Sequence, residues 1–394
     1  GLGGDGRAAR GRARAAEGGR GRAALLAVLS KDGLESIAEH TYHPGSYTPL
    51  DNLLNPRWMW LTERLPTWLA PNLVTVVGFA PLVASYLLLW RYSPDFATTV
   101  PRWLCLFVAF STFFYQSTDA MDGKQARRTG SATPLGQLFD HGFDCLACIS
   151  VHSAAGMVLL FGGSYLNVGC IAALMTGFFL AQWQERWTGV MPTSSSGVVG
   201  VTEVQWFLIM AVLVTAFKAP GRPFDVLVST RLAQGWMLFC VGLVVVCLKQ
   251  TLGHVQRTSP HLMAQAIRDT LPVLALDCLL VLLPRHALAY SPRVVPLLAG
   301  LLFYFYTVQM ILFSMAKMPF PALQPTVLLF AALVCVARAL PGQQAAVGLA
   351  FSGATCLVAA RVAVWLLVVI HELKAKLGIN VWTISSTSSL AAAA

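Results

Sequence analysis

Charged residues are scarce in this chain. Asp, Glu, Lys and Arg make up 12% of its 394 residues, whereas hydrophobic residues make up 56%. Soluble domains carry about 25% charged residues, so this composition excludes an ordinary soluble globular protein. Long apolar runs take the place of the missing charges, and they predict an all-α integral membrane protein.

A zinc-binding arrangement of cysteines is also absent from the sequence. Nine Cys are present, and Cys145 and Cys148 form a CxxC pair. No second pair stands nearby to complete a tetrahedral zinc site. The pair lies where a buried helix is expected to begin, so we interpret these Cys as small apolar core residues.

The composition divides the chain into four predicted parts. Residues 1–30 form an arm rich in Arg, Gly and Ala, which is typical of disorder, although an Arg-rich and acid-poor segment also fits a transit peptide. Residues 31–70 are amphipathic and carry Trp beside Arg, which predicts helices lying along the membrane surface. Residues 71–380 form the polytopic domain, and residues 381–394 form a C-terminal tail.

About ten apolar segments are long enough to be candidate membrane-spanning helices. If the Arg-rich arm is cytosolic, an even number of spans returns the C-terminus to the cytosol. The cytosolic segments are then richer in Lys and Arg than the luminal loops, as the positive-inside rule requires. Arg361 is placed to break the last span. The predicted spans are 73–90, 103–121, 143–161, 165–184, 204–217, 232–248, 271–284, 294–316, 319–337 and 342–370.

Four aspartates flank the connection between the second and third predicted spans. Asp119 and Asp122 are three residues apart, and Asp140 and Asp144 are four residues apart. On a helix, each pair therefore lies on one face, and two antiparallel helices would present all four carboxylates to a common centre. The residues expected to supply the turn between these helices are Gly123, Gly130, Ser131, Pro134 and Gly136.

Carboxylates inside a bilayer need a partner. Each unpaired acid costs about 2.5–3.5 kcal/mol at the centre of a span, and four of them repel one another. Oxygen ligands without Cys indicate Mg²⁺ or Mn²⁺, and two such ions would form a clamp for phosphoryl oxygens. Lys124, Arg127 and Arg128 stand next to the acids and suit an anionic phosphate substrate. The alternative that spacing alone leaves open is a set of charges solvated in a loop.

These residues resemble a known signature. The wording "DGKQARRT" and "PLGQLFDHG" is similar to the eukaryotic choline/ethanolaminephosphotransferases, and "PTWLAPNLVT" and "VIHELKAKLGI" are similar to the plant-type aminoalcoholphosphotransferases. Gln137 stands where that wording has Glu, and Gly130 where it has Asn, but neither is a fixed position. The pattern that resembles the CDP-alcohol phosphotransferase signature is Asp119-x2-Asp122-Gly123-x2-Ala126-Arg127-x8-Gly136-x3-Asp140-x3-Asp144.

The resemblance implies an activity and a site. It implies transfer of phosphocholine or phosphoethanolamine from CDP-choline or CDP-ethanolamine to the sn-3 hydroxyl of diacylglycerol, with release of CMP. It also implies a homodimer in the endoplasmic reticulum or Golgi membrane, with the site facing the cytosol. The implied ligands of two divalent ions are Asp119, Asp122, Asp140 and Asp144. The residues implied to line the CDP site are Asn72, Gly123, Ala126, Arg127 and Gly136.

The acceptor hydroxyl must also lose a proton. A carboxylate held by two cations is a weak base, because the cations favour its ionised form. His141, beside Asp140, is a better candidate, and a histidine base is usually oriented by a carboxylate. Glu203 in "GVTEVQ" stands at the cytosolic start of the fifth predicted span. We therefore predict a catalytic His141–Glu203 pair, with Asp144 as the competing base.

Three other functions fit parts of the pattern. A phosphatidyltransferase that uses CDP-diacylglycerol is typically shorter, with fewer spans. A membrane transporter would explain buried acids, but not Gly, Ala and Arg at fixed offsets from them. An aspartate-rich prenyl transferase would need a DDxxD cluster, and no adjacent Asp-Asp pair occurs. Nucleic-acid binding is not expected either, because the Arg-rich arm is short and featureless.

The remaining charged residues in apolar segments are interpreted structurally. Glu185 and Arg186 are interpreted as an interfacial pair whose charges reach the headgroups. Asp277 is interpreted as a residue at a helix end, and His152 as a residue of helix packing.

Overall fold

Helices account for nearly all of the regular structure in this computed structural model, which describes residues 28–192, 199–217 and 226–384. Within those residues no strand is present, and the only β-type pairing is an isolated bridge between Pro44 and Met191. The predicted all-α class is confirmed, whereas the predicted arm over residues 1–30 and the tail over residues 381–394 fall largely outside the described residues. The α-helices are α2 (Lys31–Ala38), α3 (Pro49–Arg64), α4 (Pro71–Tyr92), α5 (Arg102–Arg128), α6 (Pro134–Leu159), α7 (Tyr165–Thr188), α8 (Val201–Phe217), α9 (Val226–Thr258), α10 (Met263–Val281), α11 (Arg285–Tyr290), α12 (Val294–Met315), α13 (Pro325–Ala339) and α14 (Gln344–Leu377).

Every predicted span coincides with one of these helices, from α4 to α10 and from α12 to α14. Within the described residues, 6 helices are long and apolar enough to cross a membrane: α4, α6, α7, the Gln234–Thr258 part of α9, α12 and α14. The apolar helices α8 and α13 are shorter. The chain is therefore an integral membrane protein, and the number of crossings beyond these helices stays a prediction. Arg361 does not break the last span, because α14 continues through it with the guanidinium 5.7 Å from the Phe305 ring centroid.

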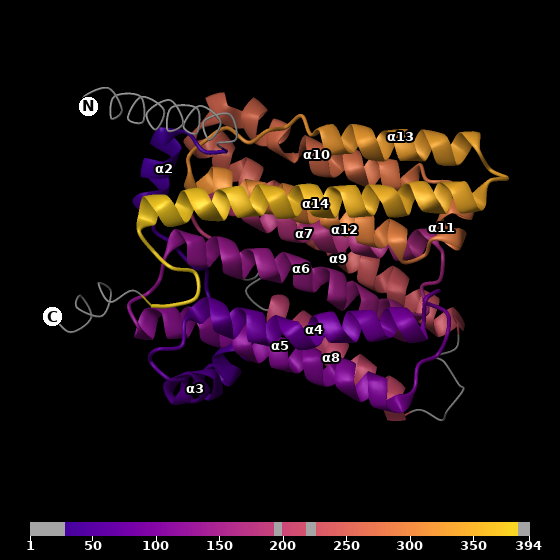
Figure 1. Cartoon of the computed structure of the whole chain (residues 1–394), viewed down its shortest axis with the longest axis horizontal. Coiled ribbons are helices and arrows are strands. Elements are labelled where there is room, and N and C mark those ends of the chain that lie inside the picture. The colour runs from indigo at the N-terminus through magenta and orange to yellow at the C-terminus, as the bar shows by residue number, and fades with distance from the viewer. Residues whose placement is uncertain (1–27, 193–198, 218–225, 385–394) are drawn as a thin grey trace, which may run out of the picture.

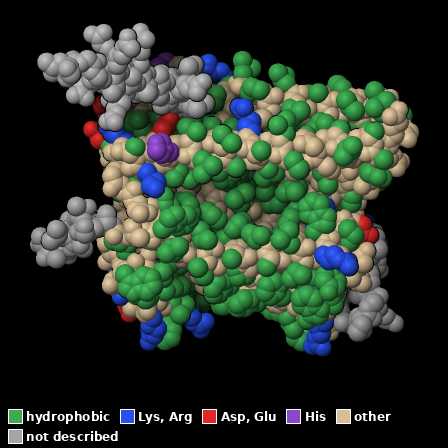
Figure 2. Space-filling model, viewed as in Figure 1, with side chains coloured by type: hydrophobic (Ala, Val, Ile, Leu, Met, Phe, Trp, Pro, Cys, Tyr) green, Lys and Arg blue, Asp and Glu red, His purple; other side chains and the backbone are tan. Residues whose placement is uncertain are grey.

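The long helices lie side by side in a bundle (Figure 1). The core helix is α12, which packs against α6, α7 and α14 and is buried along most of its length. On one side of α6 lie α4, α5 and α8, and on the other lie α12, α14, α10 and α13 (Figure 1). Figure 2 shows hydrophobic side chains covering the middle of the viewed face, with Lys and Arg mainly toward the two ends of the helices. This distribution is typical of a surface in contact with a bilayer.

The predicted amphipathic segment contains two helices, α2 and α3, at the same end of the bundle as the end of α14 (Figure 1). Glu372 of α14 accepts hydrogen bonds from the backbone N–H groups of Val28 and Leu29, which ties the start of α2 to the bundle. The helix α3 begins with a capping box of Thr48 and Asp51 and packs against α5. The position of both helices at the membrane surface stays a prediction.

The connection between α5 and α6 is shorter than the sequence suggested. The helix α5 continues to Arg128, and the chain reverses through Gly130, whose φ of 61° favours glycine. Thr133 then caps α6 by accepting a hydrogen bond from the Gly136 N–H. Gly123 lies inside α5 and Gly136 in the first turn of α6, so the prediction that both belong to the turn is wrong. The longer α5 carries both of its aspartates within regular helix.

A close approach of α4 and α5 fixes the position of the aspartates on α5. Gly78 of α4 faces the buried Thr118, and a Cβ at Gly78 would overlap the Thr118 hydroxyl. Gly78→Ala is therefore expected to push α5 away, to cost about 1–3 kcal/mol of stability and to disturb the neighbouring Asp119. Thermal unfolding in detergent measures the loss. The matched control is Gly353→Ala on α14, where a Cβ would meet nothing within 4 Å; an equal effect of both changes would contradict the explanation.

Candidate active site

The structure brings the aspartates of α5 and α6 together. Asp119, Asp140 and Asp144 each present a carboxylate oxygen, and these three oxygens lie within 4.8 Å of one another. Asp122, one turn beyond Asp119 on α5, is buried and accepts a hydrogen bond of 2.5 Å from Thr75 of α4. The spacing of three and four residues thus produces the predicted convergence. The role of each aspartate as a metal ligand stays a prediction.

The donor set of this cluster fits a hard divalent cation. Asp140 Oδ1 is buried without a hydrogen-bond partner in the described part of the chain. Asp144 Oδ1 accepts a hydrogen bond of 2.7 Å from the Tyr115 hydroxyl, which orients the carboxylate but adds no positive charge. The only ion pair among the described residues joins Arg186 and Asp269, so no Lys or Arg neutralises the cluster there. Ionised carboxylates this close repel one another, and a divalent cation held between them would remove that repulsion. Oxygen-only ligands suit Mg²⁺ or Mn²⁺.

A cavity of about 520 Å³ opens beside the aspartates and contains all the residues predicted to bind CDP. Asp122 and Asp140 contribute to its wall. In the part of the chain that the structure describes, no hydrogen bond or ion pair engages the guanidinium of the exposed Arg127, so this cation is free to meet a diphosphate. A Cβ at Gly123 would stand 3.6 Å from that guanidinium, in space that glycine leaves open. The predicted residues that line the cavity are Asn72, Gly123, Ala126, Arg127 and Gly136.

Parts of this cavity come from segments that the sequence did not indicate. His40, Thr41 and Tyr42, between α2 and α3, line one side. The segment after α14 lines another, and the Asn72 side chain donates a hydrogen bond of 2.9 Å to the Val381 carbonyl oxygen. Residues 72 and 381 are far apart in the chain, and no local pattern predicts such a contact.

A second cavity of about 200 Å³ also borders the cluster, and it is mainly apolar. Tyr115 and Asp144 form its polar end. The rest of its wall comes from α6, α7, α8 and α9, with residues such as Gly177, Phe178 and Trp236. The aspartates therefore border two cavities: a larger one whose wall includes the cation of Arg127 and the amides of Asn72 and Gln137 beside apolar residues, and a smaller one that is mainly apolar.

His141 is buried on α6 and lines the larger cavity. Its Nδ1 lies 3.3 Å from Gln182 Oε1, and because an amide oxygen only accepts, the His141 Nδ1–H is the donor. In this tautomer the lone pair is on Nε2. Gln182, which the sequence analysis did not single out, is thus the observed partner of His141.

The predicted partner Glu203 is engaged elsewhere. Its Oε2 accepts a hydrogen bond of 2.8 Å from the Gly200 N–H, at the start of α8. Its Oε1 is buried without a partner among the described residues. No hydrogen bond joins Glu203 to His141 within those residues, so the His141–Glu203 pair stays a prediction.

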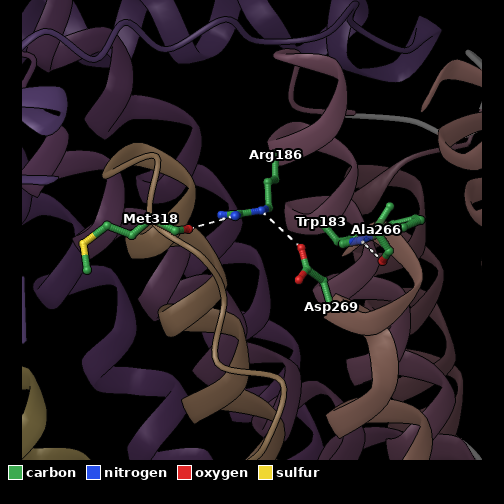
Figure 3. A network of polar contacts seen from close by, with 5 residues as sticks. All are labelled: Trp183, Arg186, Ala266, Asp269 and Met318. Carbon is green, nitrogen blue, oxygen red and sulfur yellow. Dashed lines mark hydrogen bonds and ion pairs between the residues drawn. The ribbon is translucent and has the colours of Figure 1, made fainter. Parts of the chain in front are cut away.

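Glu185 and Arg186 do not form the interfacial pair that the sequence suggested. Arg186 Nε lies 3.3 Å from Asp269 Oδ2 of α10, and the guanidinium also donates to the Met318 carbonyl (Figure 3). Both partners are at most one-tenth exposed, so the predicted exposed pair is wrong. Trp183 donates to the Ala266 carbonyl, which adds a second link between α7 and α10 (Figure 3). These contacts fix the end of α7 beside the site.

The sequence that carries this site is similar to a known protein family and to several curated proteins. Residues 68–248 match the family model described as CDP-alcohol phosphatidyltransferase. Cholinephosphotransferase 1 of Gallus gallus is 39% identical over 195 residues, which cover 49% of this chain and 57% of the relative. The protein of the same name from Danio rerio is 40% identical over 194 residues, 48% of this chain and 49% of the relative. That from Homo sapiens is 38% identical over 196 residues, 49% of this chain and 47% of the relative. The chain thus matches about half the length of these curated relatives.

Proposed function

We propose that the chain transfers phosphocholine or phosphoethanolamine from a CDP-alcohol to diacylglycerol and releases CMP, since residues 68–248 match the family model described as CDP-alcohol phosphatidyltransferase. The observation that carries this proposal is the position of the aspartates between the polar cavity and the apolar cavity. A soluble nucleotide donor and a lipid acceptor reach the site from different surroundings. Each therefore needs a cavity of its own, and the two cavities must meet at the reacting phosphorus. The relatives named cholinephosphotransferase favour CDP-choline as the donor.

The polar cavity would hold the donor. The Arg127 guanidinium suits the diphosphate, and Gly123 and Ala126 leave room for it to approach the backbone of α5. Asn72 would meet the nucleotide at the start of α4. The cluster Asp119, Asp122, Asp140 and Asp144 would hold one or two divalent ions, Mg²⁺ or Mn²⁺, which supply neutralising charge to the diphosphate and the CMP leaving group.

The acceptor would arrive from the apolar cavity. Diacylglycerol chains suit a wall of apolar side chains from α6 to α9, and Asp144 and Tyr115 mark the polar end where the hydroxyl would lie. In-line attack then forms a bond between the acceptor oxygen and the β-phosphorus and breaks the bond between that phosphorus and CMP. Such a reaction depends mainly on positioning and charge neutralisation.

His141 would take the proton of the acceptor hydroxyl at Nε2. The hydrogen bond from Nδ1 to Gln182 fixes the tautomer that leaves Nε2 free. Glu203 is predicted to orient the ring, and its Oε1, which has no hydrogen-bond partner among the described residues, is available for that role. Asp144 remains the competing base, and its Oδ1 already accepts a hydrogen bond from the Tyr115 hydroxyl.

We also propose a homodimer in the endoplasmic reticulum or Golgi membrane, with the polar cavity facing the cytosol. This proposal follows from the family resemblance and from the distribution of Lys and Arg along the chain.

A donor-exchange assay tests the proposed function. Purified protein in lipid–detergent micelles receives diacylglycerol and either CDP-choline or CDP-ethanolamine, with Mg²⁺ or Mn²⁺, and we expect CMP and the phospholipid in equal amounts. Removal of the divalent ion by EDTA is expected to abolish both products, and its return to restore them. Turnover of CDP-diacylglycerol with glycerol phosphate or inositol instead would indicate the phosphatidyltransferase alternative. Ion-dependent solute flux without CMP release would indicate a transporter.

A further inference from the structure

A chain of hydrogen bonds connects the edge of the polar cavity to a buried carboxylate that the mechanism does not use. His40 Nε2 lies 2.9 Å from Gln137 Oε1, and Gln137 Nε2 lies 2.9 Å from Glu185 Oε1. Because a carboxylate only accepts, the Gln137 amide donates to Glu185 and its oxygen accepts from His40. His40 and Gln137 line the cavity, and Glu185 lies behind Gln137 on α7. The buried Glu185 therefore supports this part of the cavity wall through its hydrogen bond with Gln137.

No ion pair among the described residues neutralises the charge of Glu185. The residue is only 9% exposed. The neighbouring Arg186 is paired with Asp269 (Figure 3). A buried carboxylate without a cation is costly, and one hydrogen bond from a neutral amide offsets only part of that cost. A cation that enters the cavity would remove the remainder.

Tyr42 places an aromatic ring where such a cation would lie. Its ring lies edge-on to His141, with the centroids 5.5 Å apart, and it lines the cavity. Burial raises the pKa of Tyr42, and the negative charge of Glu185 raises it further, so the phenol stays neutral. A neutral aromatic ring beside a carboxylate is the arrangement that binds ammonium and quaternary ammonium groups.

The location fits the alcohol of the donor. In a CDP-alcohol, the cytidine and the alcohol leave the diphosphate on opposite sides. The same cavity is lined by Asn72 and Arg127, which suit the nucleotide and the diphosphate, and by Tyr42 and Gln137. The alcohol is bonded to the phosphorus that is attacked, so it must lie near the proposed base His141, which is the neighbour of Tyr42.

We propose that Tyr42 and Glu185, connected through Gln137, form a subsite for a positively charged alcohol, so that the protein selects donors whose alcohol carries a cation. The inference rests on the proposed transferase function and adds a basis for its substrate class. Since the alcohol is held equally in the ground state and the transition state, the subsite acts mainly on KM and little on kcat.

A neutral isostere of the donor tests this directly. In CDP-3,3-dimethylbutanol a carbon atom replaces the nitrogen of CDP-choline, so the shape is kept and the charge is lost. The unaltered protein is expected to prefer CDP-choline in kcat/KM by about 30-fold or more. Glu185→Gln is expected to reduce that preference by at least about fivefold through a higher KM for CDP-choline, with the isostere unaffected.

A double variant that moves the carboxylate from position 185 to position 137 tests whether the charge itself, and not a change in the fold, causes the preference. Gln137 and Glu185 are nearly isosteric and bonded to each other, so the double change Gln137→Glu with Glu185→Gln keeps the hydrogen bond and moves the carboxylate to the cavity wall. This double variant is expected to recover most of the lost preference. Tyr42→Phe should keep the preference and Tyr42→Leu should lower it, because only the ring is needed. Asp95→Asn, a carboxylate removal in the loop after α4, is the matched control and should change nothing.

The outcomes distinguish failure of the cation subsite from failure of the proposed transferase function. Equal use of both donors by the unaltered protein overturns the inference and leaves the transferase function standing, and this comparison needs no variant. An undiminished preference in Glu185→Gln, or no recovery in the double variant, also overturns it. Absence of CMP release from every CDP-alcohol with diacylglycerol would instead remove the proposed function.

Discussion

Asp140→Asn is expected to lower CMP release by about 10³-fold or more, because an amide carries no charge and is a poor ligand for a hard cation. Asp140 Oδ1 is buried and has no hydrogen-bond partner among the described residues, and it belongs with Asp119 and Asp144 to the cluster whose carboxylate oxygens lie within 4.8 Å of one another. Removal of this carboxylate weakens the hold on a divalent ion while it also relieves repulsion between like charges. Activity and stability should therefore change in opposite directions.

Two measurements on the same samples check this expectation. Turnover is followed as CMP release with CDP-choline and diacylglycerol. Thermal unfolding is followed with and without Mn²⁺, and the ion should raise the Tm of the unaltered protein but not that of Asp140→Asn. The control is Asp277→Asn, since Asp277 is also an acid of an apolar helix but is bonded to Thr176, outside the cluster. A variant at position 140 that keeps both its turnover and its Mn²⁺ response would contradict the assignment.

The helices and the aspartate cluster were accessible from sequence because both follow from local spacing. Apolar runs of about twenty residues predict helices wherever they occur, and each predicted span coincides with a helix. Spacing of three and four residues places Asp119 with Asp122 and Asp140 with Asp144 on single helix faces. A short turn then brings the two faces together. No contact between distant segments is needed for this part of the site.

The other side of the cavity depends on distant segments, and sequence could not place it. Tyr42, between α2 and α3, meets His141 of α6, and Asn72 meets Val381 after the last helix. No periodicity encodes such contacts, because they depend on how α2, α6 and α14 pack. The prediction for Arg186, a polar residue at the end of an apolar segment, is wrong because its partner comes from a distant segment. Arg186 was expected at the headgroups, but α10 places Asp269 within 3.3 Å of it.

His141→Ala is expected to lower turnover by about 10²–10⁴-fold while donor binding is kept. The change removes the Nε2 lone pair that would take the acceptor proton, and it leaves the four aspartates and Arg127 in place. Turnover is measured as CMP release, and donor binding is measured separately by calorimetry with CDP-choline. His152→Ala is the matched control, because His152 is also a buried histidine of α6 but is bonded to Asn167, deeper in the bundle.

The partner of His141 decides how the base is held. If Gln182 orients the ring, Gln182→Leu should lower kcat by about tenfold, and Gln182→Glu should keep it, because a carboxylate accepts from Nδ1–H as the amide does. If Glu203 supplies the orientation, Glu203→Gln should carry the larger loss instead. Near-normal turnover in His141→Ala would exclude both arrangements and return the role to Asp144, whose Oδ2 could accept the proton while Oδ1 keeps the hydrogen bond from Tyr115.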